Sequence, residues 1–318
     1  MCFDLDSPLV QAADDAHGLM CAVAGIKASP PSYTVLTSRL SKLLIDAFST
    51  AAGPLIGAAI RKIAAISDRP GTIAERAAAV TGEMLSLREA LIAAGIQLTD
   101  DDKDLLLPAL RGSYKLGLKE MSTAANVSMS FGVADADAIA GLNRNGIYWV
   151  GKHYGDVIPQ GVIDDVLREM VLEKGYGAEA AGEKLASMFK NAVFKRSESY
   201  WKGFSHVITT RARTFGSLST MVNIEVEEYE YVNPMDERTS PVCEALNGTI
   251  FRVEHAIDLR DRLLQAQDPE EWKAIAPWVK VSDITDATGA LLSAPELVAM
   301  GVIMPPQHMF CRSQILIR

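Results

Sequence analysis

The chain has 318 residues, of which 48% are hydrophobic and 22% are charged, proportions that are ordinary for a globular protein and argue against wholesale disorder. Its formal net charge of -9 argues against a dedicated nucleic-acid-binding protein, because such proteins usually carry a net positive charge. Its four cysteines are too few and too scattered for a disulfide framework, so a reducing compartment is expected.

Residues 1–32 are predicted to form an irregular arm. From Tyr33, apolar residues recur at spacings of three and four, which gives a helix one apolar face. Gly53 and Pro54 are expected to interrupt this helix. A second helical run continues to the end of the apolar stretch Thr50–Ile66, which contains two basic residues and is too short to span a bilayer, so no membrane span is expected.

Capping signals predict the next two helices. Thr72 and Glu75 have the spacing of a capping box, so a helix should begin there and end at Gly95. Another helix is expected to start after Thr99, where three aspartates suit the positive end of a helix dipole, and to extend to Ala125.

The rest of the first two thirds is also predicted to be helical. The stretch Phe131–Tyr154 contains four glycines and is expected to form short helical pieces. Longer helices are predicted over Val162–Lys174 and Ala178–Ser219. Residues 33–219 are therefore interpreted as an α-helical body.

The pattern changes near residue 220. Apolar and acidic residues nearly alternate over Asn223–Tyr231, as in a strand with one solvent-exposed face. Thr249–Val253, after the turn signal Asn247-Gly248, and Gln314–Ile317 are further predicted strands. Helices are predicted between these last two at Glu254–Gln265, Pro269–Ala276 and Ala294–Met300. The expected fold class is mainly α, with a helical N-terminal body and a smaller C-terminal α+β module at 220–318.

Two motif-rich segments lie within this module, at Asp236–Phe251 and Met304–Ser313. They resemble the C-terminal signature of the phage Mu F-like head morphogenesis proteins, Asp-x-Arg-Thr-Cys-Pro-x-Cys-x-x-Leu-x-Gly followed by Pro-Pro-x-His-x-x-Cys-Arg-Cys. The matching residues are Asp236, Arg238, Thr239, Pro241, Cys243, Leu246, Gly248, Pro305, Pro306, His308, Cys311 and Arg312. Thr210–Thr214 resembles the family's helix with Ala-Arg-Thr, so the resemblance covers about 210–318.

The resemblance implies a minor head protein that acts in procapsid assembly at or near the portal. Its partners would be the portal protein and capsid or scaffold proteins, with packaged DNA as a further candidate. It would lie in the head interior or at the portal vertex of the virion, after assembly in the host bacterial cytoplasm, and ejection with DNA is compatible with this place. No enzymatic activity, cofactor, membrane or small-molecule substrate is expected.

Independently of the resemblance, the two segments have the features of a structural organiser. Asp236 and Thr239 can satisfy backbone N–H groups at a turn, and Arg238 can pair with a carboxylate or with carbonyls at the end of an element. Pro305-Pro306 imposes an extended approach to His308. The two segments should bring the last strand back to the first.

Three residues of this module are candidate zinc ligands: Cys243, His308 and Cys311. Ser240 and Ser313 stand where the family has cysteines, and only Asp236 is near enough in the sequence to complete a four-ligand site. We therefore expect no bound metal, and favour a buried contact or packed free thiols for the two cysteines.

Two enzymatic alternatives arise from the same region. Cys243 could be a nucleophile with His308 as base and Asp236 as the orienting group, yet nothing marks an oxyanion site or a substrate pocket. Four glutamates could suggest the Glu-x-Glu of an ADP-ribosyltransferase, but the exposed face of an edge strand explains Glu225, Glu227, Glu228 and Glu230 better. A toxin or enzyme delivered with the particle is the alternative function.

A basic segment gives a third interpretation, a DNA-binding accessory protein. Residues 184–213 contain one acidic residue, Glu198, and seven basic ones: Lys184, Lys190, Lys195, Arg196, Lys202, Arg211 and Arg213. They could face packaged DNA or an acidic partner. The interpretation that we favour is an amphipathic helix with lysines in water and its core face formed by Phe189, Phe194, Trp201 and Phe204.

Overall fold

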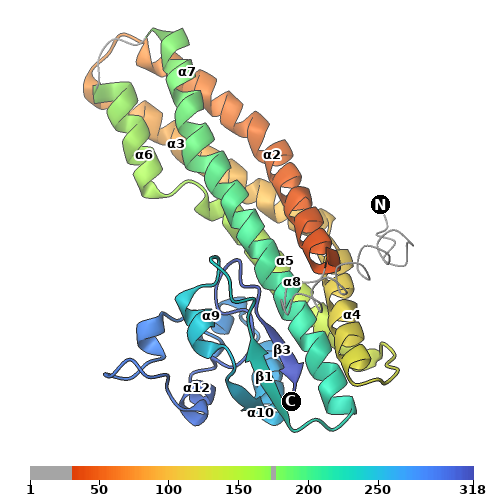
Figure 1. The fold of residues 1–318 in the computed structure, drawn as a ribbon. Helices are drawn as coiled ribbons and strands as arrows, with labels where there is room; N and C mark the ends of the chain where they lie inside the picture. The colour runs from red at the N-terminus through yellow and green to blue at the C-terminus, as the bar shows by residue number, and fades with distance from the viewer. Residues whose placement is uncertain (1–30, 173–176) are drawn as a thin grey trace. The chain divides into compact units, whose positions relative to one another are not determined.

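The computed structural model describes residues 31–172 and 177–318 (Figure 1). The predicted arm lies outside them, except for its last two residues, which begin a helix. The fold is mainly α, with a small three-stranded antiparallel sheet near the C-terminus, as the sequence predicts.

Helix α2 (Pro31–Ser67) is one continuous helix, so the predicted interruption at Gly53 and Pro54 is wrong. Proline inside a helix removes one backbone hydrogen bond. The buried stripe nevertheless continues past it, from Phe48 through Ala52 to Ile56, and burial on both sides of Pro54 outweighs that local cost.

Among the described helices, α2 alone is long and apolar enough to cross a membrane by length and composition. Its most apolar window has a mean hydropathy of 1.6, and 28% of that window is buried inside the protein. The expectation that this region is too short to span a bilayer therefore does not hold for the whole helix.

Helix α3 (Ile73–Asp101) begins at the predicted capping box, in which Thr72 and Glu75 exchange hydrogen bonds. It does not end at Gly95, because this residue is a packing site: a Cβ there would lie 2.7 Å from Tyr154 Cβ. Thr99 also lies inside α3, where its hydroxyl donates to the Gly95 carbonyl at 3.1 Å, so no helix starts after it.

Two more helices lie before residue 157. Helix α4 (Leu107–Ala124) starts later than the predicted helix, and α5 (Val133–Asp156) is a single helix in place of the predicted short pieces. Helix α6 (Gln160–Leu167) ends in a π-helical turn. Helix α7 (Ala178–Phe189) continues through a second π-helical segment into α8 (Arg196–Asn223).

The chain divides into two compact units. One comprises the described residues up to Leu40 together with Leu106–Gly146 and Lys202–Arg318, and the other comprises Ser41–Leu105 and Ile147–Trp201. This division differs from a boundary at residue 220, because the second half of α8 belongs with the C-terminal sheet.

The sheet has the strand order β2-β1-β3, with β1 (Glu228–Val232) between β2 (Ile250–Arg252) and β3 (Gln314–Ile317). Both pairings are antiparallel, and Tyr229 lies opposite Phe251. The helices of this region are α9 (Pro241–Leu246), α10 (Val253–Gln265), α11 (Trp272–Ile275) and α12 (Ala294–Ala299).

Asn247-Gly248 is not the turn of a two-strand hairpin, because α9 lies between β1 and β2. Gly248 instead ends α9 with a φ of 81°, a conformation that favours glycine. Its N–H donates to the Tyr231 carbonyl at 2.8 Å, which starts the second strand beside the first.

Helices α4 and α8 approach each other through glycine. A Cβ at Gly117 would lie 2.0 Å from the Arg213 carbonyl oxygen, and a Cβ at Gly216 would lie 2.1 Å from the Tyr114 carbonyl oxygen. Because backbone atoms cannot move aside as a flexible side chain can, the two helices can only pack this closely with glycine at both positions.

We expect Gly117→Ala to lower the free energy of unfolding by about 3 kcal/mol, because the added methyl group must push two helix backbones apart. Gly82→Ala is the control, since Gly82 is an exposed glycine within α3 whose Cβ would meet nothing within 4 Å. This control should gain about 0.5–1 kcal/mol from the unfolded state. Urea unfolding of both variants measures the difference, and equal stability would contradict the close approach.

Candidate functional site

The two motif segments contact each other directly, and we call residues 233–248 together with 304–314 the clasp. The Arg312 guanidinium donates to both oxygens of the Asp236 carboxylate, at 2.5 and 2.8 Å. Residues 76 positions apart are thus joined in the bidentate geometry that is strongest for this pair. This ion pair holds the Asp236 pKa well below its usual range.

The turn that presents Asp236 is built as predicted, with one correction. The Thr239 hydroxyl donates to the Pro234 carbonyl at 2.6 Å and accepts from the Asp236 N–H at 3.1 Å. The backbone N–H of Arg238 donates to the Asp236 carboxylate at 2.9 Å. The guanidinium that pairs with this carboxylate is that of Arg312, however, and the side chain of Arg238 is exposed.

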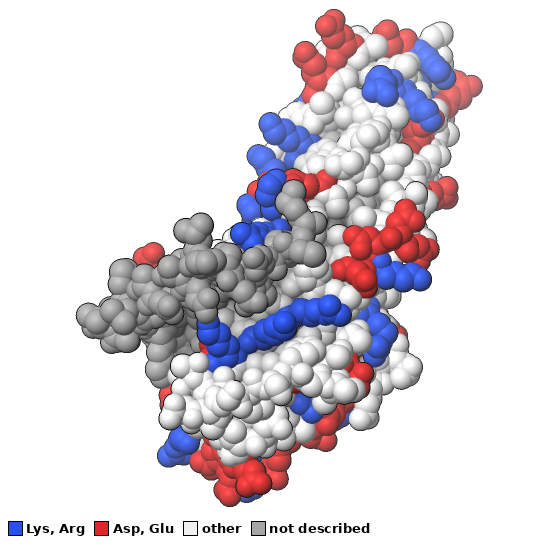
Figure 2. Space-filling model, turned by 90° about the vertical axis from the view of Figure 1, so that its right-hand side faces the viewer, with Lys and Arg blue, Asp and Glu red and all other residues white. Residues whose placement is uncertain are grey.

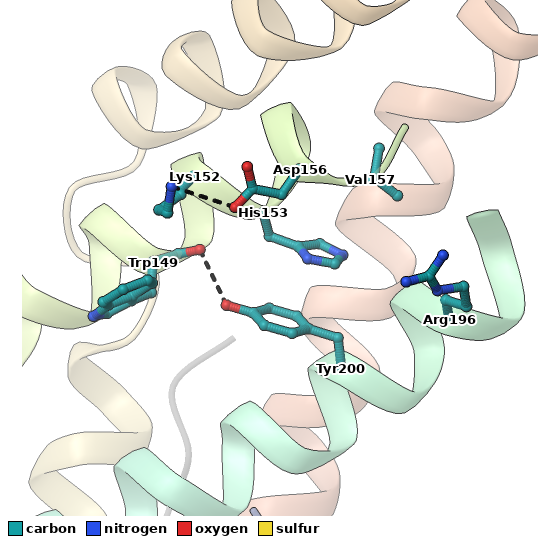
Figure 3. Close-up of a pocket in the computed structure, with 7 residues that line it drawn as sticks. All are labelled: Trp149, Lys152, His153, Asp156, Val157, Arg196 and Tyr200. Carbon is teal, nitrogen blue, oxygen red and sulfur yellow. Dashed lines mark hydrogen bonds and ion pairs between the residues drawn. The ribbon is translucent and has the colours of Figure 1, made fainter. Parts of the chain in front are cut away.

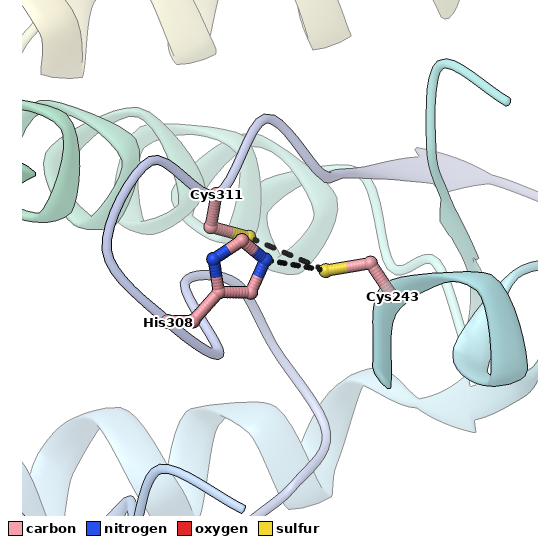
Figure 4. A group of neighbouring side chains, drawn as sticks. All are labelled: Cys243, His308 and Cys311. Atoms are coloured by element: carbon pink, nitrogen blue, oxygen red, sulfur yellow. Dashed lines mark hydrogen bonds between the residues drawn. The ribbon is translucent and has the colours of Figure 1, made fainter. Parts of the chain in front are cut away.

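The interior of the clasp gathers two thiols and an imidazole from separate elements (Figure 4). Cys243 lies on α9, while His308 and Cys311 lie on the loop before β3. The Cys243 Sγ is 3.1 Å from His308 Nε2 and 3.8 Å from Cys311 Sγ. Both cysteines are buried, and no disulfide joins them. The sequence favours this arrangement, a buried contact between two free thiols.

Local structure explains why these three side chains converge. Ser240 is the N-cap of α9 and Pro241 its first residue, which places Cys243 in the first turn. A backbone hydrogen bond of 3.3 Å from Cys311 to His308 closes a turn that sets both side chains on one side of the loop. Phe310 within this turn has a φ of 62°.

The two serines that stand in place of family cysteines also lie in this cluster. The Ser240 Oγ is 2.9 Å from His308 Nε2. The Ser313 Oγ is 3.2 Å from Cys311 Sγ and 3.3 Å from Cys243 Sγ. The cluster therefore contains five polar groups, one of them an imidazole whose other nitrogen, Nδ1, contacts a backbone carbonyl.

The two thiols differ in their acidity. The hydrogen bond from the Cys311 thiol lowers the pKa of Cys243, whereas burial raises the pKa of Cys311 well above its usual value. Cys243 is 3% exposed, which leaves its sulfur almost no open approach for a substrate. The arrangement is better suited to holding groups together than to attacking a substrate.

The remaining matched residues lie in the clasp as structural parts. Leu246 is fully buried, and the Pro305–Pro306 peptide is cis in a buried stretch before the turn at His308. Sequence reasoning missed Asn233, whose amide donates to the Cys243 carbonyl and whose side-chain oxygen accepts from Ser313. An isolated asparagine gives no signal of such a role, since both partners are distant in the sequence.

Helix α8 anchors the clasp through residues that the sequence assigned to a basic surface. The Thr210 hydroxyl donates to the Cys311 carbonyl at 3.1 Å. Arg213 is buried, and its guanidinium donates to Glu120 at 2.6 and 2.8 Å and to Gln314 at 2.7 Å.

Arg211 is also buried and lies over the Trp272 ring at 5.2 Å, and burial lowers its pKa to about 10. Arg211 and Arg213 therefore cannot belong to a surface that binds DNA.

The other predicted basic residues remain at the surface or form an ion pair. Lys184 contacts Glu169 at 3.2 Å, and the exposed side chains are those of Lys190, Lys195, Arg196 and Lys202. The aromatic side chains of this segment lie inward, with Phe189, Trp201 and Phe204 buried. This is the arrangement of an amphipathic helix. On the face drawn in Figure 2, a row of basic side chains crosses the lower half, and acidic side chains gather mainly at the bottom and the right edge.

A separate pocket of about 270 Å³ lies in the second unit (Figure 3). The His153 and Tyr200 rings stack at 3.8 Å between centroids, and the Tyr200 hydroxyl donates to the Trp149 carbonyl at 3.3 Å. Lys152 and Asp156 form an ion pair of 3.4 Å at its edge. The Tyr200 hydroxyl and the Lys152–Asp156 pair are thus engaged with other groups of the pocket.

No family model, curated protein or solved structure matches the chain. The functional interpretation therefore depends on the chemistry of the clasp and on the resemblance that its residues carry.

Removal of the outer ion pair should weaken the clasp modestly. We expect Asp236→Ala to lower the free energy of unfolding by about 1 kcal/mol, because Asp236 is 43% exposed and water screens the pair. Glu228→Ala is the matched control, since its pair with Arg318 is exposed on both sides and should contribute less than about 0.5 kcal/mol. Urea unfolding distinguishes them, and an equal effect of the two variants would contradict the assignment.

Burial lowers the pKa of His153 to about 4, which predicts a pH dependence. In the unfolded chain this side chain takes up a proton near pH 6.5, whereas the folded chain resists protonation until about pH 4. Stability should therefore fall as pH falls through this window, by roughly 1.4 kcal/mol per pH unit at most. His153→Gln should show a shallower loss between pH 7 and 4 in thermal unfolding, and an unchanged slope would refute the prediction.

Proposed function

We propose that this protein is a minor head protein of a phage, or of a prophage-derived particle, and that it acts in head assembly at or near the portal. The observation that carries the proposal is the direct contact between the two motif segments. The clasp contains the residues that resemble the signature of the Mu F-like proteins. They contact one another, although Asp236 and Arg312 are 76 positions apart.

The clasp has the chemistry expected of a structural part. Its outer ion pair, its buried thiols and its anchoring to α8 through Thr210 all connect elements of one unit. An enzymatic function with Cys243 as the nucleophile is disfavoured, because that side chain is buried. The Glu-x-Glu motif of an ADP-ribosyltransferase is disfavoured as well, because the side chains of Glu227 and Glu228 are exposed to solvent. The predicted edge strand is wrong, however, since β1, which begins at Glu228, is the central strand of the sheet.

The surface offered to an acidic partner is smaller than the sequence indicates. With Arg211 and Arg213 buried, it comprises the exposed residues near the start of α8, chiefly Lys190, Lys195 and Arg196. A few cations on a protein with a net charge of -9 favour a protein partner, such as the portal ring, over DNA.

Co-expression with the portal and scaffold proteins of the same genetic element tests the proposal. We expect the chain to be retained on affinity-tagged portal and to enter procapsids. Lys195→Glu/Arg196→Glu should weaken retention about tenfold if these cations meet an acidic portal surface. The matched control is Lys42→Glu, a change at an exposed lysine on α2.

Three outcomes would contradict this function. A chain that remains monomeric and free in the presence of portal and capsid proteins would exclude it. Salt-sensitive retention on DNA that disappears in Lys195→Glu/Arg196→Glu would instead favour a DNA-binding accessory protein. Growth arrest on expression that Cys243→Ala abolishes would favour an enzyme.

A further inference from the structure

We propose that the clasp binds one Zn²⁺ ion through Cys243 Sγ, Cys311 Sγ and His308 Nε2 (Figure 4). These three atoms lie within 4.8 Å of one another. Two sulfurs and an imidazole nitrogen are ligands that suit zinc, whereas magnesium and calcium prefer oxygen. The proposal does not depend on a head-assembly function and revises the expectation, based on sequence alone, that no metal is bound.

The spacing of the sulfurs matches a zinc tetrahedron. Zinc–sulfur bonds of about 2.3 Å at a tetrahedral angle place two sulfurs about 3.8 Å apart. The Cys243 and Cys311 sulfurs are 3.8 Å apart. A disulfide would bring them to about 2.05 Å, so the pair is arranged for a shared ion and not for a bond between them.

The imidazole is oriented as zinc ligands usually are. His308 Nδ1 contacts the Met309 carbonyl, which makes Nδ1 the protonated nitrogen and leaves the Nε2 lone pair free to bind. This Nε2 is the atom that faces the Cys243 sulfur, at 3.1 Å. A backbone carbonyl behind a metal-binding histidine fixes both its tautomer and its orientation.

The two serines supply the rest of the site. Ser240 Oγ lies 2.9 Å from His308 Nε2, and we assign it or a water molecule as the fourth ligand. The Ser313 Oγ lies 3.2 and 3.3 Å from the two sulfurs, beside the proposed ion. Serine at both positions thus leaves an oxygen beside the ligand atoms, and the cluster stays closed.

A buried hydroxyl beside the cluster also favours an ion. The Tyr231 hydroxyl is buried with no hydrogen bond of ordinary geometry, although Cys243 and Ser313 lie near it. Zinc binding releases the two thiol protons and leaves thiolates, which accept hydrogen bonds more strongly than thiols. The metal-bound cluster would therefore offer this hydroxyl an acceptor.

Metal analysis and cobalt substitution test the site in the full-length protein, purified under reducing conditions. We expect about one zinc per chain. Co²⁺ in place of zinc should give the visible bands of a tetrahedral ion and a sulfur-to-cobalt charge-transfer band. Chelation should lower the melting temperature, and Zn²⁺ should restore it, because the ion joins α9 to the loop before β3.

Variants assign the ligands. Cys243→Ser and Cys311→Ser should each raise the zinc dissociation constant at least about 100-fold, since even the loss of an outer-shell partner costs 10–100-fold. Cys2→Ser/Cys21→Ser is the control and should bind zinc as the wild type does. Ser240→Cys should tighten binding and strengthen the charge-transfer band, whereas Ser282→Cys, at an exposed serine, should do neither.

The wild type alone can overturn the proposal, so misfolding of a variant does not obscure the result. A folded, reduced wild-type chain that takes up no zinc would refute it. A wild-type Co²⁺ spectrum without a sulfur-to-cobalt band would do the same.

Discussion

The buried guanidinium of Arg213 is the constraint on which the C-terminal half of the structure depends. A charged group can leave water only when hydrogen-bonded partners surround it. Arg213 meets this need with Glu120 on α4 and Gln314 on β3. The same turn of α8 contacts α4 through Gly117, whose missing side chain lets the Arg213 carbonyl approach. One residue of α8 thus fixes both a helix and the last strand of the sheet.

The geometry of the clasp depends on these contacts of Arg213. Because Gln314 holds the start of β3, the loop before it must pass close to α8, where the Thr210 hydroxyl binds the Cys311 carbonyl. A Cβ at Gly203 would lie 2.7 Å from Met309 Sδ, so the loop packs directly on this helix. These contacts hold the Cys311 backbone in the place where its sulfur contacts Cys243.

Much of the fold could be predicted from the sequence, because its signals are local. The capping box at Thr72 and the strand pattern at Gln314–Ile317 each depend on a few neighbouring residues. The failures have distant causes. The sequence predicts a helix end at Gly95, but this glycine lies inside a helix, in contact with Tyr154. It also predicts that Arg213 lies at the surface, but Arg213 is buried against Glu120, which is 93 positions away. Neither partner can be inferred from spacing along the chain.

The serines of the clasp show the same limit for the candidate site. In the sequence alone, Ser240 and Ser313 stand where two sulfur ligands would be, which argues against a metal. In space, each keeps its oxygen within 3.3 Å of a ligand atom, so the cluster remains closed. The outer ion pair of Asp236 is too exposed to hold the two segments by itself. Asn233, which bonds the Cys243 carbonyl and Ser313, and the buried sulfur and imidazole groups also connect the two segments. An ion shared among the sulfurs and the imidazole would connect them more strongly than hydrogen bonds alone.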